Sequence, residues 1–103
     1  MKIVTSVAGV PIRLTPERVA HMVRRHPEMA GQEERVLETV ATPDYVQLGD
    51  AGTLVAIKHY PSTPLTEKDC AVVYRELSGE DGFVVTAYFT SQPAQWRQIA
   101  WKP

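Results

Sequence analysis

Apolar positions in the first half of the chain recur at helical spacing. Thr15-Pro16-Glu17 is typical of a helix start, with a threonine cap, a proline in the first turn and an acid beside it. The helix is expected over 15–26, because the residue before Pro27 is steered away from helical conformations. A second helix is expected over about 32–41. The core-facing residues would be Val19, Met22 and Val23 in the first helix and Val36, Leu37 and Val40 in the second.

From residue 45 onward the apolar pattern changes to a period of two, which is typical of β-strands. Residues 61–69 hold two prolines and several charges and predict an exposed loop without structure of its own. In the tail, 94–101 predicts a helical turn packed over the sheet edge. The expected strands are 45–48, 53–60, 70–77 and 83–89, with a short hairpin or bent strand over 2–14.

This order of elements predicts the fold class. A run of helices followed by a run of strands indicates an α+β fold, with N-terminal helices packed on a roughly four-stranded antiparallel sheet. The chain of 103 residues is long enough for one core, so residues 1–103 are expected to form a single domain.

The hairpin of 70–77 and 83–89 carries the most informative polar pattern. If Leu77 pairs with Phe83, then Tyr74 lies opposite Thr86 and shares a face with Thr86 and Tyr88. A slip of one residue would exchange Tyr74 for its neighbour Arg75, and the sequence leaves this register open. With a strict period of two, the core-facing residues of the last strand would be Phe83, Val85, Ala87 and Phe89.

Charge and composition exclude several classes of partner. Eleven lysines and arginines against 12 acids give a formal net charge of −1. This balance gives no general attraction to nucleic acid or to an anionic membrane, so neither DNA nor a membrane is expected as a partner. No apolar run reaches the length of about 18 residues that a spanning helix needs.

The cysteine and histidine content argues against disulfides and metal sites. A single cysteine, Cys70, excludes an internal disulfide, and a reducing compartment such as the cytoplasm is the simplest interpretation. The three histidines, His21, His26 and His59, have no pair at the helical spacing of zinc ligands. No metal and no cofactor is expected.

Three segments in this order resemble a known family. The first helix carries His21 and then Arg25-His26-Pro27-Glu28, and the second ends in Thr42-Pro43-Asp44. A strand pair follows, with Val72-Val73-Tyr74-Arg75 and Val84-Val85-Thr86-Ala87-Tyr88. The pattern resembles the small phage and bacterial domains of the barnase–EndoU–colicin–RelE-like superfamily, over roughly 12–89.

The resemblance implies a metal-independent ribonuclease that cleaves RNA by attack of the 2′-hydroxyl group. Many such domains are toxins or mobile-element proteins, so an antitoxin or immunity protein is an expected partner beside RNA. His26 would match the helix histidine of the family, and Thr86 and Tyr88 its hydroxyl-bearing positions on the last strand. The residues expected to bind substrate, chosen by residue type, are His21, Arg24, Arg25, Lys58 and Arg75.

Each candidate also has a structural interpretation. His26 could cap the negative end of its helix, and Tyr88 could be a packing aromatic with a wet hydroxyl. His21 lies five residues before His26, about 140° around a helix, so the two share a face only if the helix has ended between them. The alternative function is a non-catalytic module that uses the same cleft for RNA, a nucleotide or a protein partner.

Overall fold

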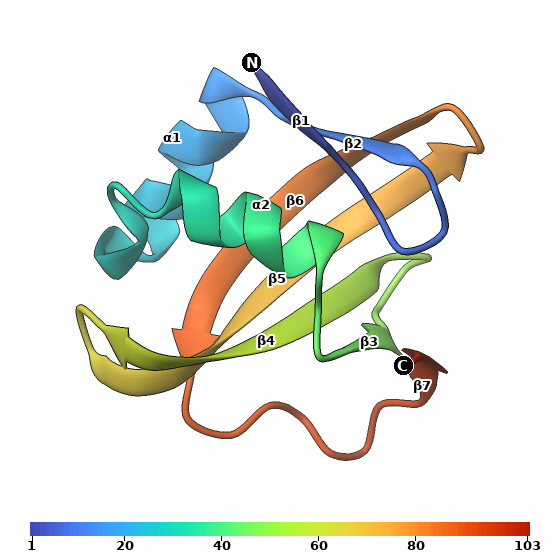
Figure 1. The fold of residues 1–103 in the computed structure, drawn as a ribbon. Coiled ribbons are helices and arrows are strands. Elements are labelled where there is room, and N and C mark those ends of the chain that lie inside the picture. Colours follow the sequence, from blue (N-terminus) through green and yellow to red (C-terminus); the bar gives the residue numbers. More distant parts are fainter.

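The computed structural model describes residues 1–103 as two α-helices and a 3-10 turn on one face of a seven-stranded sheet (Figure 1). The α+β class is therefore confirmed. Neither helix has the length and apolar character needed to cross a membrane. The helical elements are α1 (Pro16–Arg25), η1 (Pro27–Met29) and α2 (Glu33–Ala41), and the strands are β1 (Lys2–Thr5), β2 (Pro11–Leu14), β3 (Tyr45–Leu48), β4 (Leu54–Thr63), β5 (Thr66–Ser78), β6 (Asp81–Thr90) and β7 (Ile99–Trp101).

Helix α1 begins and ends where the sequence predicts. The Thr15 side chain accepts a hydrogen bond from the Arg18 backbone N–H at 3.2 Å, as an N-cap residue does. At the other end His26 leaves the helical conformation, with φ −137° and ψ 81°, directly before Pro27. The chain then turns through η1 toward α2.

The sheet is larger than predicted and is mixed. Its strand order is β1-β2-β6-β5-β4-β3-β7, and all neighbours are antiparallel except β2 and β6. The expected four-stranded antiparallel sheet, β3 to β6, is thus only its central part. The N-terminal hairpin precedes the helices and adds two strands at one edge, and β7 adds one at the other.

The parallel contact between β2 and β6 is short and depends on a glycine. It consists of the pairs Ile12–Gly82 and Arg13–Phe83. A Cβ atom at Gly82 would lie 2.6 Å from the Ile12 Cδ1 atom and 2.5 Å from a backbone oxygen of β5, so only glycine permits this approach. Arg13 also holds Asp81 through two hydrogen bonds of 3.0 and 3.2 Å.

A β-bulge in β6 corrects the predicted register. Thr86 pairs with Val73, whereas the next pair is Val84 with Tyr74, so one extra residue, Val85, stands in β6. Val84 and Ala87 therefore face the helices, and both intervening residues face away from them. The prediction that Val85 faces the core is wrong, because a strict period of two cannot anticipate an inserted residue. The register, which the sequence left open, places Tyr74 opposite Val84 and Thr86 opposite Val73.

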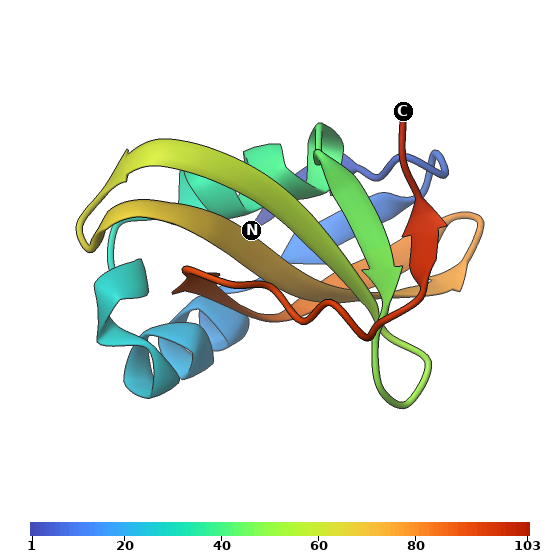
Figure 2. The ribbon, with the colours of Figure 1, turned by 90° about the horizontal axis from the view of Figure 1, so that it is seen from below.

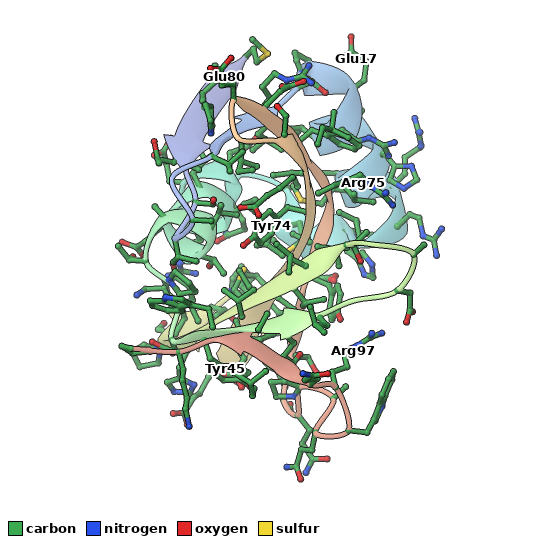
Figure 3. The ribbon with its side chains drawn as sticks, turned by 90° about the vertical axis from the view of Figure 1, so that its right-hand side faces the viewer. Glu17, Tyr45, Tyr74, Arg75, Glu80 and Arg97 are labelled. Atoms are coloured by element: carbon green, nitrogen blue, oxygen red, sulfur yellow. The ribbon has the colours of Figure 1, made fainter.

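Two apolar layers lie on the two faces of the sheet. The main core lies under the helices and includes Tyr74, which is fully buried in the middle of the molecule (Figure 3). We call the opposite side the back face. Its buried residues are Val55, Ile57 and Ala71, with Tyr45, Val73 and Tyr88 packed against them.

Two further segments differ from expectation. Residues 61–69 are largely strand, because β4 and β5 continue their pairing to Thr63 and Thr66. Residues 94–101 form no helix: 91–98 run across the back face, and β7 then pairs with β3 (Figure 2). We call 91–98 the strap. Pairing with a free sheet edge overrides the weak local helical spacing.

Candidate functional site

The C-terminal end of α1 and the bulged part of β6 enclose an open cleft of about 380 Å³. Five side chains with potential chemistry lie around it, and Val85 supplies an apolar wall. The polar lining residues are His21, Arg25 and His26 from α1 and its cap, and Thr86 and Tyr88 from β6.

The fold explains why these two elements meet. Strand β2 pairs with β6 only as far as Phe83, so the rest of that sheet edge has no strand partner. Helix α1 and η1 pack along it instead. Because α1 ends at Arg25, His26 is released from the helical spacing and lines the same cleft as His21. The sequence allowed His21 and His26 to share a face only if the helix ended between them, and it does end there.

His26 lies directly against Tyr88. Their ring centroids are 5.5 Å apart and the planes are tilted by 35°. The imidazole is about one-third exposed, with a side-chain accessibility of 33%, and its Nδ1 atom lies 3.6 Å from a carboxylate oxygen of Glu28. This distance is too long for a strong hydrogen bond, so the ring can present a nitrogen to a ligand.

Thr86 presents an unsatisfied hydroxyl group. Its Oγ1 atom is buried and has no hydrogen-bond partner. The bulge at Val85 turns Thr86 to the back face, beside the cleft. A buried hydroxyl without a partner costs free energy, and rotation of the Thr86 side chain toward the cleft would be needed for a ligand oxygen there to accept its hydrogen bond.

The cleft favours an anion. No carboxylate lines it, whereas Arg25 and two imidazoles do. The pKa of His21 is lowered, first by burial and then by the neighbouring positive charges of Arg18, Arg25 and Arg24, with a smaller contribution from His26. His21 is consequently neutral at physiological pH and able to accept a proton.

Three predicted binding residues lie elsewhere. The Lys58 ammonium donates to the Thr42 carbonyl at 2.7 Å, and the Arg75 guanidinium donates to the carbonyl of Ala51. Arg24 is exposed and does not line the cleft. The prediction that Lys58 or Arg75 lies near His26 as a phosphate-binding cation is therefore wrong. Both were chosen for their charge, and each instead satisfies a loop carbonyl.

His59 belongs to a separate cluster on the β4–β5 hairpin. Its Nδ1 atom lies 2.8 Å from an Asp69 carboxylate oxygen, and its Nε2 atom lies 2.7 Å from one of Glu67. These contacts raise its pKa, with the Asp69 hydrogen bond as the largest cause. No group of three or more histidine, cysteine or acidic side chains is arranged to hold a metal ion.

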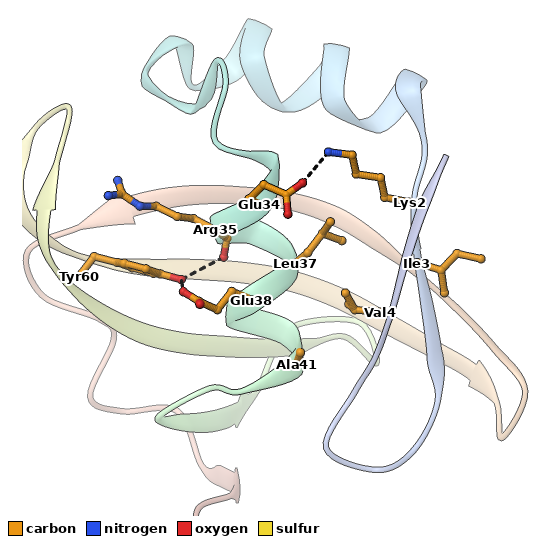
Figure 4. A pocket seen from close by; sticks show the side chains of 9 residues that line it. All are labelled: Lys2, Ile3, Val4, Glu34, Arg35, Leu37, Glu38, Ala41 and Tyr60. Carbon is orange, nitrogen blue, oxygen red and sulfur yellow. Dashed lines mark hydrogen bonds and ion pairs between the residues drawn. The ribbon is translucent and has the colours of Figure 1, made fainter.

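The largest hollow of the molecule, about 710 Å³, lies between α2 and β1 (Figure 4). Most of its polar side chains are paired with one another, and Arg35 binds Gln32 outside the hollow. Lys2 binds Glu34 at 2.7 Å, and the Tyr60 hydroxyl donates to Glu38. Because each polar side chain there already has a partner, the smaller cleft at His26 is the better candidate site.

Sequence reasoning missed two residues of the strap on the back face, Trp96 and Arg97. Their segment was expected to be helical, so no pattern placed Arg97 near Tyr88. Comparison of the chain with protein-family models, with curated proteins and with solved structures found no match.

Proposed function

We propose that this protein is a metal-independent ribonuclease whose active site is the cleft between α1 and β6. One observation carries the proposal: two histidines, an arginine, a threonine and a tyrosine line one hollow, and no acidic residue lines it. These groups supply the acid–base pair and the phosphate ligands that RNA cleavage needs. The resemblance to the barnase–EndoU–colicin–RelE-like superfamily points to the same reaction.

The reaction proposed is an internal transesterification. A base removes the proton of the 2′-hydroxyl group, and the 2′-oxygen attacks the adjacent phosphorus. The bond from phosphorus to the 5′-oxygen breaks, and an acid protonates that leaving oxygen. The products are a 2′,3′-cyclic phosphate and a 5′-hydroxyl end, so no water, metal ion or oxidant enters this step.

The neighbours of each group suggest its role. His21 has the lowered pKa of a general base. His26, against the Tyr88 ring, would donate the proton to the leaving oxygen. Arg25 would bind the phosphate, and the Thr86 hydroxyl would donate a hydrogen bond to one of its oxygens.

A non-catalytic module that binds RNA, a nucleotide or a protein in the same cleft is the second candidate. The net charge of −1 favours it, because efficient capture of long RNA is usually supported by a basic surface. A cytoplasmic toxin role, with an antitoxin or immunity protein that closes the cleft, is the biological setting that we propose for the nuclease.

The decisive variant is His26→Ala. Cleavage of a single-stranded oligoribonucleotide should be abolished, while the melting temperature changes little, because the imidazole is partly exposed and its contacts are the Tyr88 ring and the Glu28 carboxylate at 3.6 Å. His59→Ala is the matched control, since it removes a histidine outside the cleft and should retain cleavage.

A second pair tests phosphate binding. Arg25→Ala should reduce cleavage about tenfold or more, whereas Arg24→Ala on the neighbouring position should not. EDTA should leave cleavage intact. Cleavage that persists in His26→Ala, or that requires a divalent ion, would exclude this mechanism. Binding of RNA without cleavage by the wild-type protein would favour the second candidate.

A further inference from the structure

Trp96 on the strap is unusually exposed. Its relative accessibility is 76%, the highest of any large apolar residue of the chain. Tryptophan carries a large apolar surface and is generally well buried in folded proteins. The position of Trp96 therefore requires an explanation.

The indole is held in place by its neighbour. The Arg97 guanidinium lies over the Trp96 ring, 4.4 Å from the centroid, and its two terminal nitrogens bind the Asp50 carboxylate at 3.0 and 3.1 Å. Arg97 is itself largely buried, with 18% of its side chain accessible. One face of the indole is thus backed by a fixed cation, and the ring is held ready for a ligand on the other face.

The strap is anchored along this part of its course. The Gln47 side chain donates to the Ala94 carbonyl, and the Leu48 N–H donates to the Gln98 carbonyl at 2.8 Å. These bonds fix the backbone on both sides of Trp96. Arg97, labelled in Figure 3, lies at the end of the molecule far from Glu17.

We call Trp96, with Arg97 behind its ring, the platform. The register of the sheet relates the position of the platform to that of the cleft. Gln47, Val55, Val73 and Thr86 form one cross-strand row on the back face, from β3 to β6. Three strand spacings of about 4.8 Å put roughly 14 Å between the two ends of the row. Tyr88 also contributes to the raised pKa of Arg97, after the larger effect of Asp50. The platform and the cleft therefore share one face, within reach of a short nucleic-acid strand.

We propose that Trp96, backed by Arg97, stacks on an unpaired base of the RNA whose scissile phosphate lies in the His26 cleft, so that the substrate is single-stranded. This inference rests on the proposed function. A protruding indole can stack only on a base whose face is free, and bases inside a duplex are covered on both sides. A guanidinium behind the ring and an anion-binding cleft on the same face favour a nucleic acid over a protein ligand.

The test measures binding separately from cleavage. In the His26→Ala background, a fluorescent single-stranded oligoribonucleotide and a duplex of the same sequence are titrated with protein. Trp96→Ala should weaken binding of the single strand between about fivefold and a hundredfold, whereas Trp96→Phe should retain most of the affinity. Ile99→Ala, an exposed apolar residue on the adjacent β7, is the matched control and should bind normally.

The outcomes separate this inference from the proposed function. Binding that depends on Trp96 in a protein that never cleaves RNA supports the base-stacking platform and removes the nuclease. If Trp96→Ala cleaves RNA with an unchanged KM, the ribonuclease proposal stands and the proposal that Trp96 stacks on a base is overturned. Equal loss of single-strand and duplex binding overturns it too. Self-association that disappears in Trp96→Ala would assign the residue to a protein contact instead.

Discussion

At the scale of single residues, two buried hydroxyl groups without partners have different environments. Thr86 belongs to the lining of the His26 cleft, whereas Tyr74 belongs to the main core and lines a separate pocket of about 220 Å³. Burial also raises the pKa of Tyr74, so its hydroxyl stays protonated. The unpaired hydroxyl group of Thr86 is consistent with a role in the candidate site, whereas the unpaired hydroxyl group of Tyr74 is expected to lower the stability of the fold.

Removal of the Tyr74 hydroxyl should stabilise the protein. Tyr74→Phe keeps the ring and its packing and eliminates the cost of the unpaired group, which is about 1–3 kcal/mol. Thermal unfolding should show a higher melting temperature. Tyr60→Phe is the matched control: the Tyr60 hydroxyl donates to Glu38, so its loss should lower the melting temperature. A lower melting temperature for both variants would mean that Tyr74 has a partner in solution.

The lowered pKa of His21 sets the pH dependence expected for cleavage. A general base works only when it is unprotonated, so kcat/KM should rise with pH, and the midpoint of the rise should lie below the ordinary histidine pKa of 6.5. Arg18 lies outside the cleft but lowers the pKa of His21 by its charge. Arg18→Ala should therefore move the rising limb to higher pH without abolishing activity. An unshifted limb would assign the base to another group.

At the scale of elements, the bulge in β6 determines which side chains line the cleft. Val84 is 1% exposed in the main core, whereas the next residue lines the cleft. Two adjacent valines thus face opposite sides of the sheet, and they provide a sensitive test of the register.

Aspartate substitutions should distinguish the two valines. Val84→Asp buries an unpaired carboxylate and should cost several kcal/mol, on the order of 3 or more, in chemical denaturation. Val85→Asp places the same group beside Arg25 in an open cleft and should cost much less, although the added negative charge should abolish phosphate binding. The reverse order of stabilities would place the bulge elsewhere.

The hairpin of β4 and β5 carries its own pH dependence. Asp69 first and Glu67 second raise the folded-state pKa of His59, so charged His59 stabilises the folded hairpin. This stabilisation is fully present below the unfolded value near 6.5 and is lost as the pH rises through the higher folded value. Amide exchange at the end of the hairpin, corrected for its intrinsic pH dependence, should accelerate over this range. His59→Gln should abolish the added pH dependence, and an unchanged profile would contradict this role.

At the scale of the whole molecule, periodicity in the sequence predicted the α+β class, both helices and the central strands. It did so because cap residues and alternating apolar positions act locally. It could not predict the positions of β2 and β7, since both pair with distant sheet edges. The cleft was predicted in part: His26, Thr86 and Tyr88 meet there, whereas Lys58 and Arg75 were placed by charge alone and bind loop carbonyls.

The parallel junction of β2 and β6 also constrains the order of folding. Arg13 and Asp81, which meet there, are separated by 68 positions in the chain. Hairpins between consecutive strands close short loops, so β4, β5 and β6 can assemble early at little entropic cost. The N-terminal hairpin must wait for the edge of β6, and α1 packs against the same edge. Assembly of the cleft should therefore be a late event in folding, and the protein should gain most of its sheet before it gains its site.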